Sequence, residues 1–270
     1  MSGPADSILL VSLPATALLF ALVLCRVSAV VMLMPGLGET SSPMTVRAGL
    51  AVGLTFLIAP TAASIFAADG LTDAAPLRVL ALASVELFVG LFLGWLARLA
   101  AMILPLAGQF LSLLTGLSSV LQPDPELGAE TSVLSRFFSL LAPVLLLTSG
   151  IYIYPIRALV GSYDFIPPGG ALWGAVQWPI LEDTTHVVIQ TTERMFVLSL
   201  ELIAPFLLLS VLWQIALGIV SRVIPNLQIY NLATPLQIIG GLALLALLLR
   251  PMTVVWGNWS FDMLSHLPGL

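Results

Sequence analysis

Long uncharged runs separated by short polar breaks dominate the sequence. Six of these runs contain at least the roughly 18 residues that a helix needs to cross a bilayer. They cover residues 7–25, 48–68, 99–123, 137–156, 202–221 and 223–249. Because a backbone inside lipid must satisfy its own hydrogen bonds, we expect these runs to be helical. The pattern predicts an all-α, polytopic membrane protein.

Two features indicate kinked helices that pack against other protein rather than straight independent spans. Only Glu86 and Arg98 carry charge between residues 79 and 121, and one helix of that length would measure about 65 Å. Such a stretch must bend back, break near Pro105, or leave the bilayer while staying buried in protein. Proline and glycine also interrupt the runs, which lipid tolerates only beside other protein or a cavity. These positions are Pro14, Pro60, Pro105, Pro143, Pro155, Pro205, Pro225, Pro235 and Gly240–Gly241.

Composition supports the membrane assignment and excludes other classes. Of the 270 residues, 59% are hydrophobic and 9% are charged, whereas a soluble domain carries about 25% charged residues. The basic residues are all scattered arginines, so no nucleic-acid-binding stripe exists. Cys25 is alone, and His186 and His266 lie far apart, so we expect neither a metal site nor a cofactor.

Catalytic motifs are missing from the sequence. It contains no His-Glu-x-x-His for an intramembrane zinc protease and no Gly-x-Ser-x-Gly nucleophile elbow. The Gly36-Leu37-Gly38 segment lacks a third glycine and is interpreted as a turn. We therefore do not expect an enzyme.

Several ionisable residues lie within or beside the apolar runs. A charge at mid-bilayer costs about 2.5–3.5 kcal/mol, so each needs a partner or a wet cavity. Arg194 and Glu201 lie seven residues apart and so share a helix face. Snorkelling of each side chain to the interface is the alternative. The residues predicted to make buried polar contacts are Arg26, Glu86, Arg194, Glu201 and Arg222.

The most informative polar break covers residues 116–126. Prolines on both sides of Asp124 bar helix continuation and favour an extended or turn conformation. One interpretation is a surface turn between two helices. The other is irregular backbone at membrane depth that lines or closes a cavity.

A series of short motifs in a fixed order resembles a known family. The early motifs are residues 25–27, 34–38 and 46–50. The middle motifs are Gly108-Gln109, Gly116-Leu117-Ser118 and Asp124-Pro125. The late motifs are Ala204-Pro205, residues 222–227, Pro235-Leu236 and Gly240-Gly241. In order and spacing they are similar to the FliR/SctT export-gate proteins of flagellar and virulence type III secretion systems. The resemblance covers nearly the whole chain.

The resemblance implies a non-enzymatic role in a protein-conducting gate. One such subunit joins several copies of P-type and Q-type gate proteins in a helical ring, together with the B-type and A-type export proteins. The implied fold is an assembly of kinked helical hairpins, with a P-like part over residues 1–183 and a Q-like hairpin over 184–270. The implied location is the bacterial inner membrane, in a flagellar basal body or secretion-system base, where unfolded protein substrates are exported.

The resemblance also assigns two segments. The family's plug, a loop that occupies the closed pore, corresponds to residues 116–130. Its implied plug and pore residues are Gly116, Leu117, Ser118, Gln122, Pro123, Asp124, Pro125 and Glu126. The implied hairpin turn in the Q-like part contains Pro225, Asn226 and Gln228.

A second hypothesis is a stand-alone secondary transporter or channel that uses a buried polar site. That site would contain Glu86, Arg194 and Glu201. Transporters usually show related repeats, and the two halves of this chain show no convincing self-similarity.

Overall fold

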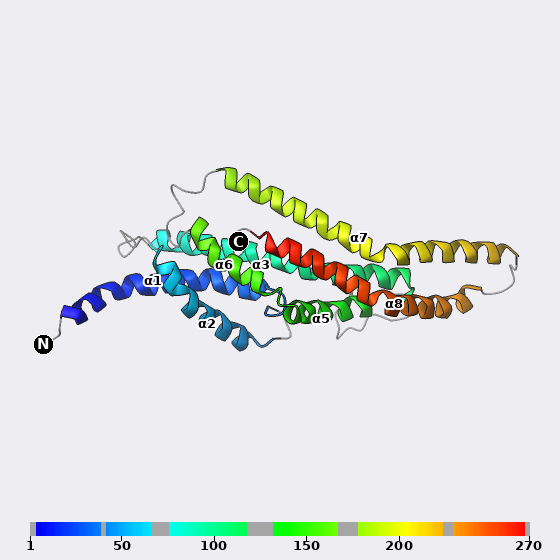
Figure 1. The fold of residues 1–270 in the computed structure, drawn as a ribbon, viewed down its shortest axis with the longest axis horizontal. Helices are drawn as coiled ribbons and strands as arrows, with labels where there is room; N and C mark the ends of the chain where they lie inside the picture. Colours follow the sequence, from blue (N-terminus) through cyan, green and yellow to red (C-terminus); the bar gives the residue numbers. More distant parts are fainter. Residues whose placement is uncertain are drawn as a thin grey trace. The chain divides into compact units, whose positions relative to one another are not determined.

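The computed structural model describes residues 4–38, 42–65, 76–117, 132–166, 178–223 and 229–267. Within these ranges the chain forms seven α-helices and no strand (Figure 1). The helices are α1 (Pro4–Leu33), α2 (Met44–Ala63), α3 (Pro76–Leu114), α5 (Val133–Thr148), α6 (Ile153–Phe165), α7 (Trp178–Val223) and α8 (Ile229–Ser265). The predicted all-α class is confirmed.

Five helices contain segments long and apolar enough to cross a membrane. The segments are Ala15–Leu33, Met44–Ala63, Pro76–Leu114, Thr185–Arg222 and Ala233–Ser265. The run over residues 137–156, predicted as one span, is instead divided between α5 and α6, which are bent by 69° at a short break. Gly150 lies in that break with a φ of 76°. This left-handed backbone is strained for other residue types and explains why the helix stops there.

Several helices extend beyond the uncharged runs, and α3 and α7 are the longest of those described. Helix α3 continues through Pro105 for 39 residues, so a break at that proline, one of the three alternatives for this stretch, does not occur. The helix ends shortly before Gly116, whose φ of 76° is a common helix terminator. Helix α7 has 46 residues and begins at Trp178, well before the run over 202–221. A charged residue ends an uncharged run in the sequence but does not end the helix, because Glu and Arg are good helix formers.

The chain divides into two compact units, and α3, α7 and α8 contribute residues to both. Unit 1 contains Met1–Arg98, Ser149–Ile189 and Met263–Leu270, and unit 2 contains Leu99–Thr148 and Gln190–Asp262. These boundaries differ from the division at residue 183 implied by the family resemblance. That division concerns likeness to two companion subunits and stays a prediction.

The core of unit 1 lies where α1 packs along α2 (Figure 1). Buried residues recur every three or four positions, which places them on one face of each helix. Leu93 of α3 and Leu159 of α6 complete the same core. The residues from α1 are Leu19, Val23, Val27, Val30 and Val31, and those from α2 are Ala51, Ile58 and Ala62. Between the two helices Gly36 adopts a φ of 86°, so the turn predicted at Gly36-Leu37-Gly38 is confirmed.

In unit 2 the second part of α3 packs closely against α5 and α8. A Cβ atom at Gly108 would lie 2.7 Å from Phe138 Cδ2, so glycine permits the α3–α5 approach. Trp256 of α8 is buried and donates its indole N–H to the Ala100 carbonyl at 2.9 Å. A buried indole requires such a partner, and this bond fixes α8 against α3.

Candidate functional site

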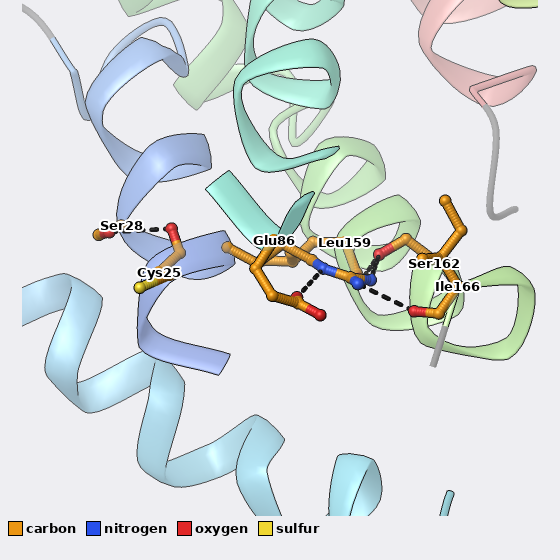
Figure 2. A network of polar contacts seen from close by, with 7 residues as sticks. Cys25, Ser28, Glu86, Leu159, Ser162 and Ile166 are labelled. Carbon is orange, nitrogen blue, oxygen red and sulfur yellow. Dashed lines mark hydrogen bonds and ion pairs between the residues drawn. The ribbon is translucent and has the colours of Figure 1, made fainter. Parts of the chain in front are cut away.

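A buried ion pair joins α1 to α3 in unit 1. The Nε atom of Arg26 donates to Oε2 of Glu86 at 2.7 Å, and the two side chains are 0% and 2% exposed. Figure 2 shows the carboxylate of Glu86 turned toward the guanidinium. The two residues lie 60 positions apart in the sequence, so the pair is a product of the tertiary fold. Both belong to the set of charges that the sequence marks as needing a partner.

Helix α6 supplies the remaining partners of the Arg26 guanidinium. Nη1 donates to the hydroxyl of Ser162 and Nη2 donates to the carbonyl of Ile166, each at 2.9 Å (Figure 2). The guanidinium carbon also lies 4.1 Å from the centroid of the Tyr163 ring, a cation–π geometry. Ile166 follows the last residue of α6, where helix carbonyls lack intrahelical donors. One side chain therefore ties α1, α3 and the end of α6 together.

Glycine on α3 allows the approach that the ion pair requires. Gly90 and Gly94 lie one and two turns after Glu86 and so share its face. A Cβ atom at Gly90 would collide with the Arg26 carbonyl and lie 2.8 Å from Ala29 Cβ. A Cβ atom at Gly94 would lie 2.9 Å from Leu33 Cβ. The Glu-x3-Gly-x3-Gly spacing thus encodes close packing of α3 on α1.

The polar contacts of Arg26 serve to hold helices together. The three guanidinium nitrogens of Arg26 each already donate a hydrogen bond. Within the described ranges, no group of three His, Cys, Asp or Glu side chains is arranged to hold a metal ion. Desolvated pairs of this kind are costly to disrupt by removing one partner, because the other charge is then left buried.

A second polar contact lies in unit 2, where α3 ends. The Nε2 atom of Gln237 on α8 donates to the Leu114 carbonyl at 2.8 Å. Thr115 is buried, and its hydroxyl donates to the Leu111 carbonyl at 2.8 Å. Gly241, one turn after Gln237, faces Thr115 so closely that a Cβ atom would lie 2.5 Å from Thr115 Cγ2. Helix α8 therefore holds the end of α3 through the Gln237 hydrogen bond and the close contact at Gly241.

This helix end is the base of the segment predicted to form the plug. Gly116 and Leu117 are the last described residues before it, and Gly116 has the left-handed backbone noted above. The other predicted plug residues lie outside the described residues: Ser118, Gln122, Pro123, Asp124, Pro125 and Glu126. The predicted hairpin-turn residues Pro225, Asn226 and Gln228 also lie outside them.

The charged residues of α7 differ from the Arg26–Glu86 pair. Arg194, Glu201 and Arg222 are exposed, so the chain by itself does not bury them. Exposed apolar side chains lie among the first two, including Val197 and Leu200. A buried contact for these three residues stays a prediction that requires another chain to cover them.

Sequence reasoning did not identify three residues that organise these contacts. Tyr163 and Trp256 occur in apolar segments where an aromatic residue is ordinary, so no sequence signal distinguishes them. Gln237 did carry a signal, because an amide inside an apolar helix needs a hydrogen-bond partner. That signal predicts a contact without naming Leu114 as the acceptor.

Comparison with known proteins gives a consistent result. The family described as bacterial export proteins, family 1, matches residues 17–263. The flagellar biosynthetic protein FliR of Caulobacter vibrioides is 32% identical over 240 residues, which cover 87% of this chain and 90% of that protein. FliR of Escherichia coli is 30% identical over 226 residues, covering 84% and 82%. The surface presentation of antigens protein SpaR of Shigella flexneri is 23% identical over 181 residues, covering 67% and 66%.

Proposed function

The chain belongs to family 1 of the bacterial export proteins, the FliR/SctT family, and from this membership we propose that it is a non-enzymatic structural component of a type III export gate. In this role it forms part of the protein-conducting pore and supplies the plug from residues 116–130. Its substrates are unfolded proteins in transit.

The single observation that carries the plug proposal is the anchored end of α3. A loop that blocks a pore needs a fixed starting point, because a freely moving base would leave the pore open. Gln237 bonds the Leu114 carbonyl, and Gly116 turns the backbone out of the helix directly afterwards. This arrangement fixes the helix end from which the proposed plug segment continues.

The exposed charges of α7 favour a gate over a stand-alone transporter. The transporter hypothesis needs Glu86, Arg194 and Glu201 in one buried site, whereas Glu86 is buried with Arg26 and the other two are exposed. Facing lipid, each exposed charge would cost about 2.5–3.5 kcal/mol near mid-bilayer. A neighbouring subunit with complementary groups removes that cost and supports a multi-subunit assembly.

The finer assignments complete the proposal. Residues 1–183 form a P-like part and residues 184–270 a Q-like hairpin, which pack beside the P-type and Q-type gate proteins. The B-type and A-type export proteins are further partners. The assembly lies in the bacterial inner membrane, in a flagellar basal body or the base of a related secretion system.

Purification and reconstitution test this function. The tagged chain, extracted in mild detergent and analysed by intact-complex mass spectrometry, should carry two small hydrophobic helical partners in defined copy number. The chain reconstituted alone should transport no solute. A chain that purifies without partners and drives solute uptake alone would support the transporter and contradict the gate.

A further inference from the structure

Arg98 of α3 is a charge in apolar sequence that the contacts above do not explain. Within the residues that the structure describes, its guanidinium makes no hydrogen bond or ion pair, and its side chain is half-buried. Helix α3 cannot supply the counter-charge. Arg78 has the same sign, and Glu86, which lies about 18 Å away along the helix, is paired with Arg26.

Arg98 lies on the face of α3 that points away from the core. Leu91 and Met102, seven residues before and four residues after it, share this face and are 40% and 48% exposed. Leu96 and Ile103 lie on the other side of the helix and are buried. The same outward face also contains the exposed side chains Leu80, Leu87 and Leu113. The guanidinium is therefore a single cation within an apolar stripe.

The length of α3 shows that lipid cannot cover this stripe from end to end. A helix of 39 residues measures about 58 Å. The hydrocarbon core of a bilayer is about 30 Å thick, and a helix tilted by 40° has about 40 Å of its length within it. Part of α3 thus lies beyond the hydrocarbon, although its outward face is apolar on both sides of Arg98. Exposed apolar surface outside lipid calls for protein cover.

Every placement of the bilayer along α3 leads to the same requirement at Arg98. Where hydrocarbon surrounds residue 98, the guanidinium needs a counter-charge, because an unpaired charge is unfavourable there. Where the hydrocarbon ends at residue 98, protein must cover the apolar side chains beyond it. A helix that covers Leu91 or Met102 also covers Arg98, which is two turns or one turn away. The guanidinium is then buried and again needs an anionic partner.

We propose that the outward face of α3 around Arg98 docks a helix of a companion subunit, and that a carboxylate of this helix pairs with the Arg98 guanidinium. Leu91 and Met102 provide apolar contacts on the two sides of the pair. An Asp or Glu side chain fits best, because a carboxylate accepts two parallel hydrogen bonds from a guanidinium. This contact rests on the proposed function and deepens it, since it names a place where a gate partner binds.

Photocross-linking in the membrane tests the contact while Arg98 is intact. p-Benzoylphenylalanine is placed at position 102 of the whole chain, which is expressed in a bacterium that carries its companion export proteins. Products are mapped by peptide mass spectrometry. We expect a cross-link to one companion subunit, in a segment with an Asp or Glu within one helical turn of the linked residue. Products with lipid alone, no protein product, or a protein segment without such a carboxylate would each overturn the proposal.

Charge variants test the ion pair itself. Arg98→Glu opposes the partner's carboxylate and should lower the cross-link yield from position 102 about tenfold. Arg98→Lys keeps the charge and should lower the yield less than about threefold. The matched control is Arg78→Glu, which makes the same reversal at an exposed position near the start of α3 and should leave the yield unchanged.

Rescue shows whether the two charges meet. An arginine in place of the Asp or Glu that the cross-link identifies should restore the yield in the Arg98→Glu variant. A yield that stays low, with both chains present in the membrane at unmodified levels, would overturn the pairing.

The subunit composition of the unmodified complex separates this contact from the proposed function. Companion subunits that co-purify with the chain, while position 102 cross-links only to lipid, would reject the Arg98 contact and leave the gate function standing. A chain that purifies without companions would contradict both.

Discussion

The guanidinium of Arg26 and the carboxylate of Glu86 are 2.7 Å apart between Nε and Oε2, and both side chains are almost fully buried. The pair joins helices that are separated by 60 residues of sequence. Through Ser162 and Ile166 it also holds the end of α6. Substitutions can test this tie and the contacts at the end of α3 separately, because the two lie in different units.

Removing one member of the ion pair should be strongly destabilising. The Arg26→Met change leaves the Glu86 carboxylate buried without its counter-charge, which we expect to cost about 3–5 kcal/mol. Thermal unfolding of the purified complex, followed by tryptophan fluorescence, measures the loss. Arg250→Met is the matched control, since Arg250 is exposed on α8. A transition temperature for Arg26→Met equal to that of the control would contradict the buried pair.

Replacing both members should restore much of the lost stability. In Arg26→Met with Glu86→Leu neither charge remains, and apolar replacements of buried pairs are often tolerated. Recovery stays incomplete, because the Ile166 carbonyl still lacks its donor and that costs about 1–3 kcal/mol. A double variant less stable than Arg26→Met alone would mean that the charges are not coupled.

Substitution by alanine should lower the stability of the protein at Gly90 but not at Gly53, which lies on the open face of α2. Alanine at Gly90 forces its Cβ against the Arg26 carbonyl and Ala29, with an expected loss of about 1–3 kcal/mol. Alanine at Gly53 meets nothing within 4 Å, so its better helix propensity adds up to about 1 kcal/mol. The same unfolding assay compares them, and equal effects would exclude close α1–α3 packing as the reason for Gly90.

Neighbouring glycines on α8 offer a similar comparison. Alanine at Gly241 meets Thr115 Cγ2 at 2.5 Å, whereas alanine at Gly240 has open space. We expect Gly241→Ala to displace α8 from the end of α3 and to expose residues 114–117 to proteolysis in the complex. Gly240→Ala should keep the proteolysis pattern of the unmodified complex. Identical patterns for both variants would show that α8 does not hold this helix end.

The charges on α7 should be needed for assembly rather than for folding. Arg194→Glu reverses an exposed charge on α7, so a complementary partner would be repelled. Co-purification of companion subunits should fall at least about tenfold while the chain still accumulates in the membrane. Arg222→Glu makes the same charge reversal near the end of α7 and shows whether the effect on co-purification depends on position along the helix. Full co-purification with Arg194→Glu would remove the main support for a covered α7 surface.

The sequence predicts the helices of this protein better than their contacts. Apolar runs identify the membrane segments, because hydropathy is a local property of consecutive residues. They do not show that the left-handed backbone of Gly150 divides residues 137–156 between two helices, nor which of the alternatives for residues 79–121 holds, where α3 passes through Pro105. A charge or a proline in a run therefore does not fix where a helix ends.

Partners within the sites are harder to predict than the residues that need them. Arg26 and Glu86 stand out as charges in apolar sequence, yet nothing local indicates that they meet each other. Gln237 needs an acceptor, and only the packing of α8 on α3 identifies the Leu114 carbonyl. Such pairings depend on helix packing, which a single sequence specifies only through scattered glycines such as Gly90 and Gly241.

The base of the proposed plug should be sensitive to the hydrogen bond that Gln237 donates to the Leu114 carbonyl. Gln237→Leu removes the donor to the Leu114 carbonyl while keeping the side chain's approximate volume. We expect a raised ion leak through the assembled complex, since the start of the loop is then less well held. Gln214→Leu is the matched control on the exposed side of α7. An ion leak of equal size in both variants would show that Gln237 has no specific role in keeping the complex closed.

Ion conductance of the assembled complex lacking residues 116–126 tests the central claim most directly. The complex is reconstituted into planar bilayers beside the unmodified one, with equal subunit composition verified by mass spectrometry. The gate function predicts a closed unmodified complex and a persistent ion conductance after the deletion. A correctly assembled deletion variant that stays as tight as the unmodified complex would contradict the assignment of these residues as the plug.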